Sequence, residues 1–332
     1  MTEQHRLTFG TLSFFVALVL SGCVTTNYSH ENHPLAGKVF HTGQQRELNL
    51  STYESVLKTA DFLLLGETHD NPKHHHWQAE AVKALFDGSN AVERHVVFEH
   101  LHVGQGPTLT EFQKIPEPNA KLLGDLVQWE KSGWPPYETF EPIVAASLQQ
   151  QAKIVAGNIP PEAIKAVYRN GMKVVLPEQT IARYKLDELP QSTKGELTQV
   201  IVDSHCGFIK SDQAGPMVDV QMSKDAFMAL QLATVRGNGK AVLIAGRGHT
   251  RKDFGVPQYL AKLQPTSTVV AVGHIEVAEG KQTLADYPEA RHYDVVVFTP
   301  AWQREDPCEK MRALMKKRRT ARLPADPLSW TF

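Results

Sequence analysis

The stretch Phe62-Leu63-Leu64-Leu65-Gly66-Glu67-Thr68-His69 joins an apolar run directly to a Gly-x-x-His sequence. The stretch Val242-Leu243-Ile244-Ala245-Gly246-Arg247-Gly248-His249 repeats this arrangement 180 residues later. Parallel sheets bind their ligands just beyond the carboxyl ends of their strands, and a glycine lets the backbone turn sharply there. The repeated pattern therefore predicts that His69 and His249 lie in two halves of one site.

Further apolar runs extend the same pattern along the chain. They are short, continuous and rich in β-branched residues, which is typical of strands buried on both faces. Segments with helical character separate them, so we expect an α/β fold with a mostly parallel sheet flanked by helices. The runs are Phe62–Leu65, Val96–Phe98, Ile154–Ala156, Ala241–Ala245, Thr268–Val272 and Val295–Phe298.

The gap between the third and fourth runs is too long for a single crossover. It predicts a helical insert at about 160–236 that caps the carboxyl ends of the strands, with 105–140 contributing to the same cap. We expect the α/β domain to span 46–302. The net charge of −1 does not indicate that the protein binds nucleic acid. No stretch of this domain reaches the roughly 18 apolar residues that span a bilayer.

The N-terminal segment is typical of an exported protein. The apolar stretch Leu12–Leu20 ends in Leu20-Ser21-Gly22-Cys23, which looks like a bacterial lipobox, so 1–22 is predicted to be a signal peptide. Cys23 would then carry the lipid and 23–45 would be a tether, anchored to a leaflet without spanning it. Val24 after the cysteine resembles outer-membrane sorting and favours a protein that faces the periplasm. The alternatives are a plain signal peptide or an N-terminal anchor.

Two features near the C-terminus have alternative interpretations. In an oxidising compartment Cys206 and Cys308 would be free to pair, and the alternative is two separate buried thiols. The tail 303–332 is basic, with eight Lys/Arg and three Asp/Glu between Arg304 and Arg322. Contact with anionic lipid headgroups is one interpretation of this charge, and a solvated helix face is the other.

Ionisable and polar residues follow four of the predicted strands. Ionisable groups at the ends of buried strands are costly unless they face a cleft or pair with one another, so their position makes them site candidates. After the first run, His75 is expected on the buried face of a helix, whereas His74 and His76 are expected to face solvent. The residues at the strand ends are Glu67, His69, Glu99, His100, Asn158, Arg247 and His249.

Three chemistries are compatible with these residues. A divalent metal would be held by His69 and His249, with Glu67 and Glu99 as further ligands. Metal-free hydrolysis would use a histidine as general base and a glutamate to orient it, although the chain has no Gly-x-Ser-x-Gly nucleophile motif. Haem would need a tyrosine or histidine ligand and basic groups for its propionates. Without a Cys-x-x-Cys-His motif, such a haem would be b-type and non-covalent.

The motifs around these residues resemble those of the ChaN-like haem-binding lipoproteins. The resemblance rests on Gly66-Glu67-Thr68-His69-Asp70-Asn71-Pro72, on Gly246-Arg247-Gly248-His249, and on the segments at Ser204–Gly207, Asp225–Ala229 and Asp306–Glu309. It implies haem capture in iron acquisition by an outer-membrane lipoprotein that works with haem-uptake machinery, with haem held at a homodimer interface. The haem contacts it implies are Tyr137, His69, His75, Arg247 and His249. The further candidates for a tyrosine ligand are Tyr168, Tyr184 and Tyr259.

The wider group around this family includes the Tiki and erythromycin esterase-like proteins. That resemblance implies hydrolysis, which is metal-dependent in some members. Glu67, His69, Glu99 and His249 would then be the catalytic residues. Haem binding is the leading hypothesis from the sequence, and a hydrolase is the alternative.

Overall fold

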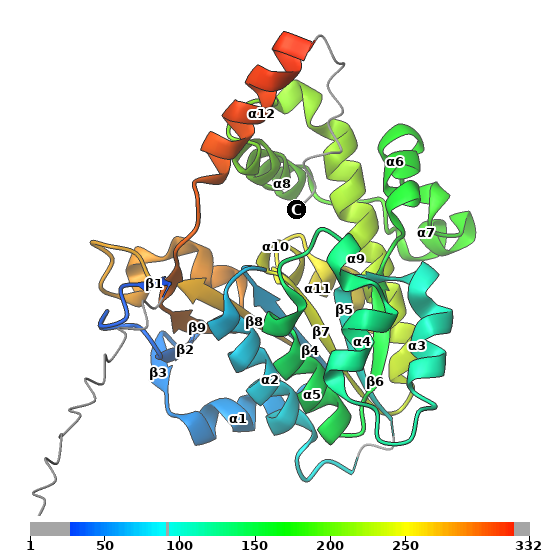
Figure 1. Ribbon diagram of the computed structural model, residues 1–332, viewed down its shortest axis with the longest axis vertical. Helices are drawn as coiled ribbons and strands as arrows, with labels where there is room; N and C mark the ends of the chain where they lie inside the picture. The colour runs from blue at the N-terminus through cyan, green and yellow to red at the C-terminus, as the bar shows by residue number, and fades with distance from the viewer. Residues whose placement is uncertain (1–26, 91–92, 322–332) are drawn as a thin grey trace, which may run out of the picture.

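The computed structural model describes residues 27–90 and 93–321 (Figure 1). The predicted signal peptide and the lipidation site at Cys23 lie outside the described residues. Among those residues, an eight-stranded sheet has the order β3-β2-β9-β8-β4-β7-β5-β6. The six strands β9, β8, β4, β7, β5 and β6 are parallel to one another, and β2 and β3 form an antiparallel edge. The strands are β2 (Val39–His41), β3 (Arg46–Leu48), β4 (Phe62–Glu67), β5 (Arg94–His102), β6 (Lys153–Asn158), β7 (Lys240–Gly246), β8 (Val269–Glu276) and β9 (Val295–Thr299).

The six predicted apolar runs coincide with the six parallel strands, so the predicted α/β fold is confirmed. Successive side chains of a strand point to opposite faces, and β4 follows this rule. Leu63 and Leu65 join the core on one face, whereas Phe62 and Leu64 join the core on the other. All four side chains are fully buried, which explains why the run is apolar throughout rather than alternating.

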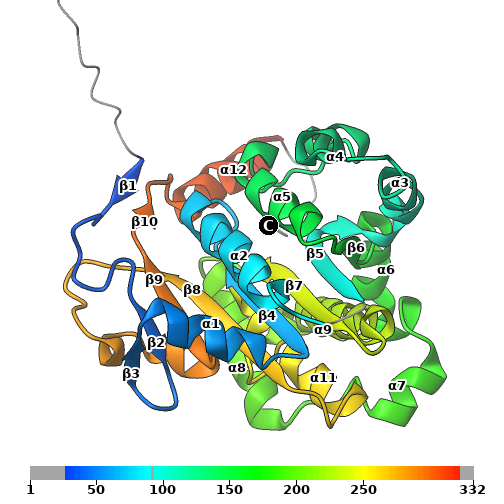
Figure 2. The same ribbon diagram turned by 90° about the horizontal axis from the view of Figure 1, so that it is seen from below.

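Helices cover both faces of the sheet, as Figure 2 shows. The first face carries α1 (Leu50–Lys58), α2 (Pro72–Phe86) and α5 (Glu141–Gln149), and the second carries α9 (Gly215–Arg236) and α11 (Val256–Leu263). Helix α2 begins directly beyond β4, where the Asn71 side chain accepts a hydrogen bond from the Lys73 amide and Pro72 occupies the first turn. This cap fixes where the chain enters α2 after the first Gly-x-x-His motif.

The predicted insert segments are helical. In Figure 1, α8 and the N-terminal half of α9 stand beyond the carboxyl ends of the strands. The first segment holds α3 (Gly106–Phe112), α4 (Ala120–Leu126) and the 3-10 turns η2 (Trp129–Lys131) and η3 (Tyr137–Thr139), after η1 (Val103–Gln105). The second holds α6 (Pro161–Asn170), η4 (Met172–Val174), α7 (Glu178–Tyr184), α8 (Gln191–Ser204), η5 (Ser211–Gln213) and α9. The remaining elements are β1 (Tyr28–Ser29), α10 (Arg247–Thr250), η6 (Leu284–Asp286), η7 (Pro288–His292), β10 (Ala301–Trp302) and α12 (Pro307–Ala321).

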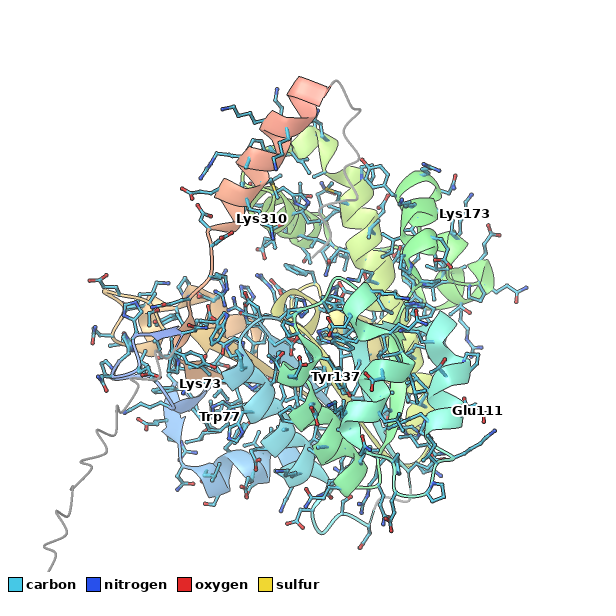
Figure 3. All side chains as sticks on the ribbon, in the orientation of Figure 1. Lys73, Trp77, Glu111, Tyr137, Lys173 and Lys310 are labelled. Carbon is cyan, nitrogen blue, oxygen red and sulfur yellow. A yellow bond between two sulfur atoms is a disulfide. The ribbon has the colours of Figure 1, made fainter. Side chains whose placement is uncertain are left out.

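A disulfide attaches the basic tail to the insert. Cys206 and Cys308 are bonded, with 5.6 Å between their Cα atoms, so the alternative of two separate thiols is wrong. The tail begins as helix α12, which carries Lys310 (Figure 3), and Cys308 in its first turn holds it near the C-terminal end of α8. Among the described residues, no helix is both long and apolar enough to cross a membrane.

Candidate functional site at the strand ends

The two motif glycines allow β4, β7 and the segments that follow them to approach closely. These strands are neighbours, and Glu67 pairs in register with Gly246. A Cβ atom on Gly66 would lie 2.1 Å from the Thr250 hydroxyl oxygen, and one on Gly246 would lie 2.8 Å from Nε2 of His69. Both positions therefore exclude any larger residue without local movement, and the two Gly-x-x-His motifs meet at one edge of the sheet.

Glu67 is the centre of the first half of the site. Its Oε1 atom lies 2.8 Å from Nδ1 of His69 and 2.9 Å from Nε2 of His100, and its Oε2 atom lies 3.4 Å from Nε2 of His75. Burial alone would raise the pKa of Glu67, but the charges and hydrogen bonds of His75, His100 and His69 hold that pKa well below its usual range. Glu67 is therefore a buried carboxylate surrounded by imidazoles.

Glu99 is the centre of the second half. Its Oε1 atom lies 2.7 Å from Nζ of Lys224 and 3.0 Å from Nε2 of His249, and its Oε2 atom accepts a hydrogen bond from the Gly246 amide at 2.9 Å. The same Oε2 atom is 3.9 Å from Nε2 of His69. One buried carboxylate thus lies between the histidines of both Gly-x-x-His motifs.

A bulge in β5 explains how Glu99 and His100 serve different halves of the site. The predicted strand ended at Phe98, but β5 continues to His102, and its register with β6 shifts between these two residues. Bulges re-aim side chains at the edge of a sheet. Here Glu99 turns toward the amide of Gly246 on β7, and His100 turns toward Glu67 on β4.

Helix α9 contributes three residues that the sequence analysis did not place in the site. Gln221, Lys224 and Asp225 are spaced as one helix face requires, and all three contact His249. Asp225 is completely buried, and its Oδ1 atom lies 2.6 Å from Nδ1 of His249. The i, i+3, i+4 spacing of these polar residues, next to apolar residues of the same helix, is the sequence signal that could have revealed this face.

The charges of Glu99 and Asp225 set the protonation of His249. Burial alone would lower the pKa of His249, but Glu99 and Asp225 raise it to about 9. Burial raises the pKa of Asp225 to about 6, and His249 opposes part of that rise. At neutral pH, His249 is therefore an imidazolium held between two carboxylates.

This shift predicts a pH dependence of stability. The pKa of His249 is about 9 in the folded protein against 6.5 for a free imidazole, so its stabilisation is fully present below pH 6.5 and is lost as pH rises through 9. The difference corresponds to about 3 kcal/mol, at roughly 1.4 kcal/mol per unit. We expect the free energy of unfolding of metal-free protein, measured in urea, to fall over this range. The His249→Gln variant should give a flatter profile, and equal slopes for both proteins would contradict the assignment.

An aromatic wall closes the first half of the site. The Trp134 ring lies 4.8 Å from the ring of His69 and 4.6 Å from that of His100, and Phe140 lies 4.5 Å from His100. The His69 side chain is 21% exposed, whereas the side chains of Glu67 and His100 are fully buried. His69 and the half-buried Trp134 therefore form the solvent-accessible edge of this half of the site.

The structure does not bring Tyr137 into the cluster. Its hydroxyl donates a hydrogen bond to the carbonyl of Ala120, its ring packs against Gly124, and it lies among the helices that cover the sheet (Figure 3). Tyr259 is fully buried in the core. Tyr184 lines a shallow groove of about 390 Å³ between α7 and α9, and Tyr168 is half-buried on α6.

The other expected residues are His75 and Arg247. His75 is buried on α2 and donates from Nδ1 to the Thr139 carbonyl. Arg247 is half-buried at the start of α10, and its charge helps to depress the pKa of the buried His74, which burial itself lowers most. The structure thus places His75 beside Glu67 and His69 between the two carboxylates, whereas the charge of Arg247 acts on His74.

The expectation that His74 faces solvent is wrong, although His76 is exposed as expected. His74 is fully buried, its Nδ1 accepts a hydrogen bond from the Thr68 amide, and its Nε2 lies 2.8 Å from the Thr299 hydroxyl. The end of β9 covers this side of α2. That contact joins residues 225 positions apart, so the helical pattern of α2 alone did not reveal it.

The fold and the site together define an α/β protein with buried carboxylates and histidines at the carboxyl ends of its parallel strands. Residues 55–260 match the family model described as haem-binding uptake, Tiki superfamily, ChaN. Since the match covers more than half of the chain, the protein belongs to this family.

The chain is similar to solved structures, of which the first agrees with the fold. The chain is similar to ChaN of Campylobacter jejuni, described with cofacial haem binding, with 23% identity, a TM-score of 0.63, and coverage of 78% of this chain and 95% of that one. A mutant of the erythromycin esterase EreC in its open conformation is 10% identical, with a TM-score of 0.41 and coverage of 82% of this chain and 98% of that one. No curated protein sequence matches the chain.

Proposed function

We propose that the protein binds haem non-covalently, for haem-iron acquisition, at the carboxyl ends of β4, β5 and β7. The observation that carries this proposal is the edge formed by His69 and Trp134, where a partly exposed imidazole lies 4.8 Å from an indole ring above buried carboxylates. The family description supports it, because the family is named for haem-binding uptake.

The residues at this edge are compatible with the chemistry of haem. A porphyrin needs a flat apolar contact, a ligand for its iron and cationic groups for its propionates. Trp134 offers the first, and Arg247 offers the last. His69 is the proposed iron contact, because it is the most exposed imidazole of the cluster, whereas the Tyr137 hydroxyl is bonded to Ala120. In this proposal His75 and His249 position the carboxylates beneath the haem.

The proposed location is the cell envelope, with Cys23 lipidated and the protein on the periplasmic face of the outer membrane. The lipobox-like Leu20-Ser21-Gly22-Cys23 supports this location, and so does the Cys206–Cys308 disulfide, because such bonds persist in oxidising compartments. Cofacial haem binding is described for the ChaN of C. jejuni. A homodimer that encloses haem, and a partner in haem-uptake machinery, stay predictions for this chain.

Haemin titration of the 24–332 form tests the proposed function. We expect a saturable shift of the Soret band, weakened at least tenfold in His69→Ala and unchanged in His76→Ala, whose exposed histidine lies on the same helix as His75. The spectrum also distinguishes tyrosine from histidine ligation. A titration without saturation, or one that is identical in the two variants, would overturn the proposal.

A hydrolase is the second candidate, favoured by the Asp225–His249–Glu99 arrangement, in which a carboxylate orients an imidazole. However, the pKa of about 9 leaves His249 protonated at neutral pH, so it would act as an acid rather than as a base. A screen of ester and peptide substrates tests this candidate. Activity lost in both His69→Ala and His249→Ala would support it, and full activity in both would exclude it.

A further inference from the structure

Three donor atoms in the first half of the site form a nearly regular triangle. Oε1 of Glu67, Nδ1 of His69 and Nε2 of His100 are separated by 2.8, 2.9 and 3.1 Å. The three residues come from two segments, the end of β4 with the residues that follow it and the bulged end of β5, which lies on the other side of β7. Among the described residues, they form a group of histidines and acids whose donor atoms all lie close enough to share one metal ion.

Hydrogen bonding among these groups leaves buried polar atoms without partners. Oε1 of Glu67 can accept hydrogen bonds from Nδ1 of His69 and Nε2 of His100, but the two nitrogens, 3.1 Å apart, cannot also bond to each other when both carry protons. Within the described part of the chain, Oε2 of Glu67 and Nδ1 of His100 also have no hydrogen-bond partner. Buried groups of this kind are rare without an unobserved water or ion.

The spacing of the triangle is closer to that of one coordination geometry than to that of another. Metal–ligand distances of about 2.1 Å place neighbouring ligands of an octahedron about 3.0 Å apart, whereas those of a tetrahedron lie about 3.4 Å apart. The observed edges match one face of an octahedron. Two histidines and one carboxylate on such a face form a known three-ligand arrangement that leaves other positions open.

The ligand types select the class of metal. Imidazole nitrogen suits first-row transition ions, whereas Ca²⁺ and Mg²⁺ take oxygen ligands. The buried Glu67 carboxylate supplies a negative charge that a divalent cation would offset. Glu99, 3.9 Å from Nε2 of His69, is placed to orient that ring from outside the triangle, as carboxylates beside metal ligands do. The rings of Phe140 and Trp129 hold His100 by packing.

We propose that Glu67, His69 and His100 form one face of a six-coordinate site for a divalent first-row transition metal. The site goes beyond haem binding and differs from the pair of motif histidines expected from the sequence. It includes His100 from β5 and excludes His249, whose two ring nitrogens are paired with Asp225 and Glu99.

Cobalt binding to haem-free protein tests the proposal. We expect one Co²⁺ per chain, with the weak visible absorption of a six-coordinate ion. Glu67→Gln and His100→Ala should each weaken Co²⁺ binding at least tenfold. His76→Ala, on the surface of α2, should retain it. Circular dichroism and thermal unfolding establish that each variant is folded. If His100→Ala does not fold, Glu67→Gln still tests the proposal, because it keeps the shape of the side chain.

Three outcomes would overturn the proposal. They are no Co²⁺ binding by folded wild-type protein, the intense absorption of a tetrahedral site, and equal binding in the wild type and both triangle variants. A fourth, loss of Co²⁺ in His249→Ala with retention in His100→Ala, would assign the metal to the motif histidines instead. Haemin titration of His100→Ala distinguishes a failure of the proposed metal site from a failure of the proposed haem binding. Co²⁺ binding with the expected dependence supports the metal site even where haem does not bind.

Discussion

The variant Glu99→Ala is expected to lose 3–5 kcal/mol of its free energy of unfolding, the order of magnitude for breaking one side of a buried ion pair. Glu99 is 1% exposed and contacts Lys224, His249 and the amide of Gly246. Its removal leaves two cations and an amide buried without their acceptor. Urea denaturation at pH 7, with a check that the m-value is unchanged, measures the loss.

Two further variants show whether the burial of Glu99 causes the large loss of stability. Glu99→Gln keeps the shape of the side chain but not its charge, so its loss should be smaller than that of Glu99→Ala and still exceed 1 kcal/mol. Glu47→Ala removes an ion pair of similar length, 2.9 Å to Lys38, with both side chains largely exposed. Exposed pairs contribute about 0–1 kcal/mol. An equal loss in Glu47→Ala and Glu99→Ala would contradict the role given to Glu99.

Removal of the disulfide is expected to have an effect of similar size. Cys206 and Cys308 are 102 residues apart, and a crosslink across about 100 residues stabilises by roughly 4–5 kcal/mol when its main effect is on the unfolded chain. We expect Cys206→Ser/Cys308→Ser to lose about this amount in urea denaturation under oxidising conditions. The reason is entropic, because the crosslink restricts the unfolded chain over the length that contains α9, β7, β8 and β9.

Reductant provides the matched control for this prediction. Dithiothreitol should bring the wild-type protein to the stability of the double variant and should leave the double variant unchanged. A loss below 1 kcal/mol in the double variant would show that the crosslink adds little, as strain or residual structure in the unfolded chain would allow.

Local sequence signals were sufficient for the sheet and for part of the site. The six parallel strands were predictable because a strand buried on both faces is apolar at every position, as in Phe62–Leu65. The glycines of the two motifs marked the sheet edge because a Cβ atom fits at neither Gly66 nor Gly246. These features depend on residues close together in the sequence, so one chain is enough to reveal them.

The remaining parts of the site depend on contacts between distant segments. Asp225 reaches His249 only because α9 packs across β7, and His74 is buried only because β9 ends above it. The bulge in β5 gives Glu99 and His100 separate partners, although the apolar run indicated a strand end at Phe98. Packing between elements decides each of these three features, and no periodicity within one segment encodes it.

The position of the iron in crystals of haem-loaded protein tests the central claim most directly. Anomalous scattering at the iron edge locates the metal without assumptions about its ligand. We expect one iron peak beyond the carboxyl ends of β4 and β5, next to His69 and Trp134. A peak beside Tyr184 in the groove between α7 and α9, or no bound iron in haem-soaked crystals, would contradict a haem site at the strand ends.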